Sequence, residues 1–345
     1  HHGDVAPRHG PRTRALALAR ELWGERHPTV AAALENLATT NMDLGRHDEA
    51  REQLLDAQRI YEAALGSQSV KLIEIYNKLA AHQQRTGQLS ESVKTLRRAL
   101  AIAEPANAEG VTSTVNLHAN LGTSLLNLGE HEEAVAELQR ATAIAEERFG
   151  PEATQTAMLQ INLGSAFLAS GRHQSCVDIT EQAVPVLSKR VSSDHRGLFY
   201  AHLNLASAYS NLDRSGPALR ALERAMATAP HRDAEVAAVE TMRGVVLRDT
   251  GDYDGASAAF SACAGLLADT PEHHRRSKCL SDRAYVELLA ERPATAREIL
   301  EPLREQIERN RDEPAPLTIA NVHVNLARAL GNSGRARRIE LLETA

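Results

Sequence analysis

Apolar residues recur every three or four positions along almost the whole chain, in stretches separated by short polar breaks. Around Gly129, for example, one such stretch precedes the glycine and a second follows it. The first contains Val115, Leu117, Leu121, Leu125 and Leu128, and the second contains Ala134, Leu138, Ala141, Ile144 and Ala145. This period is typical of an amphipathic helix, and glycine readily ends a helix in the left-handed conformation. The pattern therefore predicts two helices joined by a tight turn.

Turn positions of this kind return at an almost constant interval. Gly45, Gly87, Gly129 and Gly171 are 42 residues apart, and further steps of 42, 38, 40 and 43 residues reach Asp213, Gly251, Glu291 and Gly334. Seven positions before each turn position stands a small residue: Ala38, Ala80, Gly122, Gly164, Ala206, Gly244, Ala284 and Ala327. Small side chains at fixed places allow two antiparallel helices to cross closely. The sequence thus predicts a two-helix unit that is copied about eight times.

The first copy contains His27-Pro28-Thr29-Val30, Leu34-Glu35-Asn36-Leu37-Ala38, Leu44-Gly45 and Asp48-Glu49-Ala50. These residues resemble the tetratricopeptide repeat, in the form of about 42 residues found in kinesin light chains and many bacterial proteins. The resemblance is close over about residues 27–190 and weaker afterwards, where Arg243 and Arg283 replace a leucine and the eighth copy is incomplete after Gly334. It implies an all-α fold, a right-handed α-solenoid of about eight helix-turn-helix units.

The breaks between copies predict the organisation of the chain. Residues 1–12 are interpreted as a disordered tail or the remnant of a purification tag, and residues 13–26 as an orphan capping helix. The solenoid is expected over residues 27–345, in units of about 27–66, 67–109, 110–150, 151–192, 193–231, 232–271, 272–313 and 314–345. The orphan helix and the incomplete last copy leave two alternatives open: the chain is cut from a larger protein, or its ends contact another molecule.

Polar residues repeat on the first helices at a place where packing does not require them. The slot nine positions before the turn holds Asn36, Lys78, Asn120, Asn162, Asn204 and Asn325, with Met242 and Asp282 in the sixth and seventh copies. Four positions earlier stand Asn116, Tyr200, Lys278 and Asn321, and three positions later Thr39, Thr123, Ser165, Ser207 and Tyr285. The resemblance implies that the asparagines face a concave groove and bind the backbone of a peptide, to which an amide offers both a donor and an acceptor. The alternative is that they hydrogen-bond a neighbouring helix.

Composition and charge exclude several other classes of protein. The chain has 57 alanines and 43 leucines but only four Phe, six Tyr and one Trp, which favours helices over β-structure. A net charge of −6 disfavours nucleic acid as a partner, and no apolar run is long enough to span a membrane. The three cysteines show neither a disulfide framework nor a zinc motif, and the first residues are no signal peptide. We therefore expect a cytoplasmic protein without a membrane or nucleic-acid partner.

Catalytic motifs are missing from the sequence. It contains no GxxxxGK[ST] loop, no GxSxG and no kinase signature. His47, His131 and His173 all stand two positions after a turn glycine, and recurrence in separate copies indicates packing in the turn, not a metal or catalytic site. Cys176 and Cys263 are expected to be buried structural thiols. We predict that the chain is not an enzyme and binds no cofactor or metal.

Three functions remain after these exclusions. The first is a scaffold that binds a peptide or a partner domain in the concave groove. The second is the regulatory or sensory array of a larger bacterial signalling protein, because the repeats resemble those appended to bacterial Ser/Thr protein kinases, nucleotide-switch regulators and caspase-like proteases. The third is a structural module that forms a homo-oligomer through its ends or its convex face.

Overall fold

The computed structural model describes residues 6–103, 112–192, 195–228, 232–270, 272–309 and 316–330, and the regular structure in these residues is entirely α-helical. The chain divides into two compact units, His1–Arg172 and His173–Ala345. The first unit contains α1 (Ala6–Trp23), α2 (Pro28–Asp43), α3 (His47–Leu65), α4 (Lys71–Arg85), α5 (Leu89–Ala103), α6 (Thr112–Leu128), α7 (His131–Phe149) and α8 (Thr154–Ala169). The second unit contains α9 (His173–Arg190), α10 (Arg196–Asn211), α11 (Ser215–Thr228), α12 (Asp233–Asp249), α13 (Tyr253–Leu266), α14 (His273–Leu289), α15 (Pro293–Arg309) and α16 (Pro316–Leu330).

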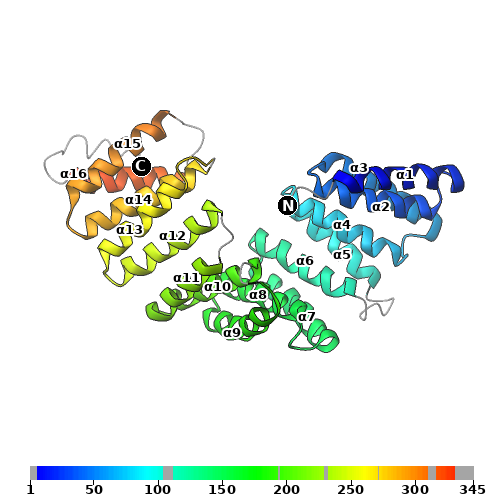
Figure 1. Cartoon of the computed structure of the whole chain (residues 1–345), viewed down its shortest axis with the longest axis horizontal. Helices are drawn as coiled ribbons and strands as arrows, with labels where there is room; N and C mark the ends of the chain where they lie inside the picture. The colour runs from blue at the N-terminus through cyan, green and yellow to red at the C-terminus, as the bar shows by residue number, and fades with distance from the viewer. Residues whose placement is uncertain are drawn as a thin grey trace. The chain divides into compact units, whose positions relative to one another are not determined.

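Within each unit, every helix packs on the next helix along the chain (Figure 1). First helices of successive copies also touch: α2 contacts α4, α4 contacts α6 and α6 contacts α8, while in the second unit α10 contacts α12 and α14 contacts α16. This arrangement confirms the all-α fold and the predicted helix-pair repeat. The second helix expected for the eighth copy falls in residues 331–345, outside the described residues, and the exact unit boundaries stay a prediction.

The hydrophobic core continues from each copy into the next. One buried cluster joins Ala38 and Met42 of α2, Ala50 and Leu54 of α3, and Leu79 of α4. A repeat therefore completes its core only when the first helix of the following copy covers it, as expected for a stacked array.

The small-residue slot allows the close crossing that the sequence predicts. A Cβ atom added to Gly122 on α6 would lie 2.6 Å from Cγ of Leu138 on α7. At Gly244 on α12, an added Cβ atom would lie 2.8 Å from the ring of Phe260 on α13. Leu138 and Phe260 are fully buried, so neither side chain can move away without disturbing the core.

Helix α1 differs from the expectation at its start. It begins at Ala6, so residues 6–12 are helical, and their assignment to a disordered tail is wrong. Pro7 stands in the first turn, where its missing N–H needs no partner. Arg12 donates from Nη1 to the carbonyl oxygen of Asn36 on α2 at 2.9 Å. The helix over residues 6–12 was not predicted because Pro7, Gly10 and Pro11 interrupt the helical pattern of the sequence.

The turn positions adopt the left-handed conformation in the described copies. The glycines at positions 45, 87, 129, 171 and 251 have φ between 73° and 85°. Asp213 and Glu291 occupy the same place with φ of 57° and 58°, and they are the only non-glycine residues with positive φ in the described part of the chain. The spacing argument therefore located these two turns correctly, although neither contains the expected glycine.

Replacing Glu291 by glycine should raise the free energy of unfolding by about 0.5–1 kcal/mol. The left-handed conformation costs a side-chain-bearing residue on the order of 1 kcal/mol, and glycine avoids most of this cost. Urea unfolding followed by circular dichroism measures the change. The control is Glu298→Gly inside α15, which should lower stability by about 1 kcal/mol, because glycine is unfavourable in a helix interior. Destabilisation by both substitutions would contradict the assignment of Glu291 to a strained turn.

Candidate functional site

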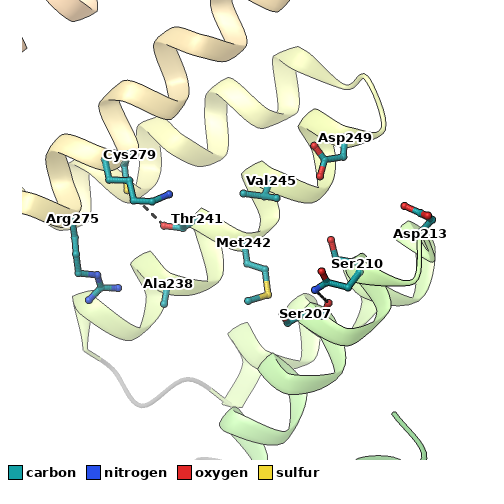
Figure 2. Close-up of a pocket in the computed structure, with 12 residues that line it drawn as sticks. Ser207, Ser210, Asp213, Ala238, Thr241, Met242, Val245, Asp249, Arg275 and Cys279 are labelled. Atoms are coloured by element: carbon teal, nitrogen blue, oxygen red, sulfur yellow. Dashed lines mark hydrogen bonds between the residues drawn. The ribbon is translucent and has the colours of Figure 1, made fainter. Parts of the chain in front are cut away.

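A pocket of about 600 Å³ opens on the first helices of the fifth, sixth and seventh copies, within the second unit. It lies between α10, α12 and the start of α14, as Figure 2 shows. Its lining consists of Ser207, Ser210, Asn211, Asp213, Ala238, Thr241, Met242, Val245, Asp249, Arg275, Lys278 and Cys279.

The pocket uses the repeat slots that the sequence assigns to the groove. Met242 occupies the slot nine positions before the turn, and Ser207 and Lys278 occupy the two neighbouring slots. Of the ten residues predicted to bind a ligand, however, only Lys278 lines this pocket. Thr241, Asp249 and Arg275 were not predicted, because they stand outside the three slots considered.

Charge is divided between the two ends of the pocket. Arg275 and Lys278 come from the first turns of α14, whereas Asp249 ends α12 and Asp213 follows α10. Figure 2 shows Arg275 on the opposite side of the pocket from Asp213 and Asp249. Ala238, Met242 and Val245 lie between these ends, and all three are half-buried, so the middle of the pocket offers apolar surface.

The basic residues already have partners: the ion pair of Lys278 is open to solvent, whereas that of Arg275 is half-buried. Lys278 Nζ lies 2.9 Å from a carboxylate oxygen of Asp282, with 59% of the lysine side chain exposed. Arg275 pairs with Glu272 and also donates to the carbonyl oxygen of Ala234 at 3.1 Å. The second contact fixes Arg275 at the beginning of α12. An exposed ion pair such as that of Lys278 contributes about 0–1 kcal/mol, so a ligand carboxylate can compete for this lysine.

A disulfide bond forms part of the wall. Cys263 of α13 is bonded to Cys279 of α14, and their Cα atoms are 6.1 Å apart. The expectation of a free thiol at Cys263 and of no disulfide is therefore wrong. The bond was missed because an odd number of cysteines shows no pairing, while the antiparallel packing of α13 and α14 brings two distant positions together. Thr241 Oγ1 lies 3.2 Å from Sγ of Cys263, next to the pocket.

Cys176 behaves as predicted. It is a buried free cysteine on α9, and burial raises the pKa of its thiol to about 11. The thiolate, which is the reactive form, is therefore scarce at neutral pH.

In the first unit, two of the predicted ligand-binding residues connect neighbouring first helices. Lys78 Nζ lies 2.5 Å from a carboxylate oxygen of Glu35 and 3.5 Å from one of Glu74. Asn120 donates from Nδ2 to Oδ1 of Asn77 at 2.7 Å. These contacts favour the packing alternative for Lys78 and Asn120.

The remaining predicted residues divide by exposure. Asn36, Asn116, Asn162, Lys278 and Asn321 are exposed, whereas Asn204 and Asn325 are buried. Tyr200 is 43% exposed, and its hydroxyl accepts a hydrogen bond from Arg196 at 3.0 Å. That these residues bind a ligand stays a prediction.

A further polar slot, eleven positions before the turn, was not recognised in the sequence. It holds Tyr76, His118, Gln160, His202 and Glu240 in the second to sixth copies, and all five are buried, whereas the first and seventh copies have Leu34 and Leu280. Tyr76 donates to Glu62 at 3.0 Å, Gln160 donates to Glu146 at 3.1 Å, and Nδ1 of His118 lies 2.6 Å from a carboxylate oxygen of Glu137. The same 42-residue interval that revealed the turns could have found this slot.

The histidines after the turn glycines occupy equivalent places. His47, His131 and His173 are the first residues of α3, α7 and α9, and each has a buried Nδ1 atom. Among the described residues, no three His, Cys, Asp or Glu side chains are grouped so that they could hold a metal ion.

The repeats were compared with known protein families and structures. Residues 29–104 and 113–189 match the tetratricopeptide repeat family. Over these two stretches the sequence is similar to tetratricopeptide repeats. No curated protein sequence matches the chain. Among its described helices, none is long and apolar enough to cross a bilayer.

Several solved structures share the fold of this helix-pair array. BtubC from P. vanneervenii is 19% identical, with a TM-score of 0.57 over 64% of this chain and 89% of its own. A putative kinesin light chain from Podosopora anserina is 26% identical, with a TM-score of 0.52 over 59% of this chain and 96% of its own. Apo RapI has a TM-score of 0.68 over 99% of this chain and 96% of its own, at 11% identity. The predicted link to a Ser/Thr kinase and the predicted self-association are not tested by these similarities and stay predictions.

Proposed function

We propose that this chain is a protein-interaction module that holds an extended peptide segment of a partner protein against the first helices of its repeats. The pocket between α10, α12 and α14 is the observation that supports the proposal. It combines half-buried apolar side chains with exposed polar groups, as ligand sites generally do. Its residues come from three successive copies, so an extended segment bound in the pocket would touch all of them.

The proposal assigns a binding role and no chemistry to the chain. The pocket contains serine, threonine and carboxylate side chains but no histidine to serve as their general base. Its sulfur atom at Cys279 is held in the disulfide bond. Binding without catalysis is therefore the function that this set of side chains supports best.

Filling the pocket should abolish peptide binding. A random heptapeptide display library is selected on the wild-type protein, and the dissociation constants of the recovered peptides are measured by fluorescence anisotropy. Val245→Trp places a large ring in the hollow and should weaken binding at least about tenfold, which corresponds to 1.4 kcal/mol. Ala258→Trp, at an exposed position of α13, is the control and should bind as the wild type does. Recovery of no peptide, or equal binding by both variants, would overturn the proposal.

A further inference from the structure

The distribution of charge in the pocket restricts which peptide it can accept. Arg275 is held at the beginning of α12 by its hydrogen bond to the carbonyl oxygen of Ala234, and Lys278 lies one turn further along α14. Asp249 is the last residue of α12, where its carboxylate lies 2.7 Å from Nη2 of Arg248, so a basic ligand side chain competes with this arginine; Asp213 follows α10. The cationic and anionic ends are therefore separated by most of the length of α12.

The rise of an α-helix gives the scale of that separation. Ala238 and Asp249 both line the pocket, and eleven steps of about 1.5 Å place them about 16 Å apart along the helix axis. An extended chain advances about 3.3 Å per residue, so about five residues of peptide span this distance. A single small zwitterion such as a free amino acid is too short to reach both ends.

The middle of the pocket lacks charge. Met242 and Val245 face the hollow from α12, while Thr241 and Ser207 supply hydroxyl groups beside them. An apolar side chain of a bound peptide would cover the half-buried surface of Met242 and Val245 and remove it from water. Nucleic acid fits poorly, because its phosphates would meet Asp213 and Asp249 at one end.

We propose that this pocket selects an extended peptide segment that carries an acidic and a basic side chain about five positions apart, with an apolar side chain between them. The acidic side chain pairs with Arg275 and Lys278, and the basic side chain pairs with Asp213 and Asp249. This inference rests on the proposed function and adds the chemistry of the ligand. Charge complementarity of this type contributes more to the choice of partner than to total affinity.

The test uses acetylated and amidated heptapeptide libraries in which the first and sixth residues are fixed and the residues between them are randomised. Five libraries carry Glu and Lys, Lys and Glu, two Glu, two Lys, or two Gln at these places, which covers both chain directions. We expect at least one mixed-charge library to give about tenfold more binding than the like-charge and Gln libraries. Equal binding by all five would overturn the charge assignment while leaving peptide binding intact, and binding by none would overturn both.

Variants then identify the groups responsible. Lys278→Ala should weaken the best mixed-charge peptide about threefold to fivefold, the size expected of a partly exposed ion pair. The same peptide with its Glu changed to Gln should bind wild type and Lys278→Ala equally. Lys189→Ala, at an exposed position of α9, is the matched control and should have no effect. An equal loss for the Glu and Gln peptides would show that Lys278 does not contact the acidic side chain and would overturn the assignment.

Discussion

Acidification from about pH 7 to about pH 4 should cost the second unit about 3 kcal/mol of stability through His202 alone. His202 on α10 is 5% exposed, and its Nδ1 atom has no hydrogen-bond partner among the described residues. Burial, with a smaller contribution from the positive charge of Arg224, lowers the pKa of this histidine to about 4 from a usual value of 6.5. The folded protein therefore keeps the imidazole neutral at a pH where the unfolded chain has already protonated it.

The sign of the effect follows from proton binding. Between pH 6.5 and about 4 the unfolded state binds more protons at this site than the folded state does, so stability falls as the pH falls. Well above pH 6.5 neither state is protonated, and the contribution of His202 is constant. Urea unfolding of the wild type and of His202→Gln at several pH values in this range gives the free energy of unfolding as a function of pH. The difference between the two slopes is the contribution of His202.

An exposed histidine provides the matched control. His274 lies on the surface of α14, and His274→Gln should leave the pH dependence unchanged. If His202→Gln follows the same pH profile as the wild type, the histidine is not kept neutral by burial, and the prediction is wrong.

Reduction of the bond between Cys263 and Cys279 should destabilise the second unit by about 3 kcal/mol. The bond closes a loop with a sequence separation of 16 residues. A closed loop of about this length lowers the entropy of the unfolded chain by an amount worth about 3 kcal/mol at 25 °C. Urea unfolding with and without a phosphine reductant measures the difference.

Two variants and a count of free thiols test whether the effect of the reductant comes from the bond between Cys263 and Cys279. Cys263→Ala/Cys279→Ala should not respond to reductant, whereas Cys176→Ala should respond as the wild type does, because Cys176 is free. Alkylation of the unfolded, unreduced protein should modify one cysteine, and three after reduction. Modification of three cysteines before reduction would show that the bond is absent from the protein.

The local fold was predictable because its signals repeat. Each copy confirms the spacing of the others, so the positions of Asp213 and Glu291 could be assigned as turns even without glycine. The close contact of Gly244 with Phe260 follows the same logic, because a small residue recurs wherever two helices cross. A single copy would not have supported either inference.

Features belonging to one copy or to one pair of helices were harder to predict. The disulfide depends on how α13 packs on α14, and a sequence with three cysteines does not specify which of them meet. The pocket likewise depends on Thr241 and Arg275, whose residue types do not recur at the same slots in the other copies. Repetition in the sequence identifies the framework that the copies share. A site formed by residues that differ between copies can be recognised only in the three-dimensional structure.

The bond between α13 and α14 also determines how the chain would respond to a pulling force. Repeat arrays have few long-range contacts, so under tension their helices detach one after another and the chain lengthens stepwise. The segment between Cys263 and Cys279 cannot be drawn out while the bond is intact. At about 3.4 Å per residue, it withholds roughly 50 Å of extension, so the junction between the sixth and seventh copies resists mechanical unfolding.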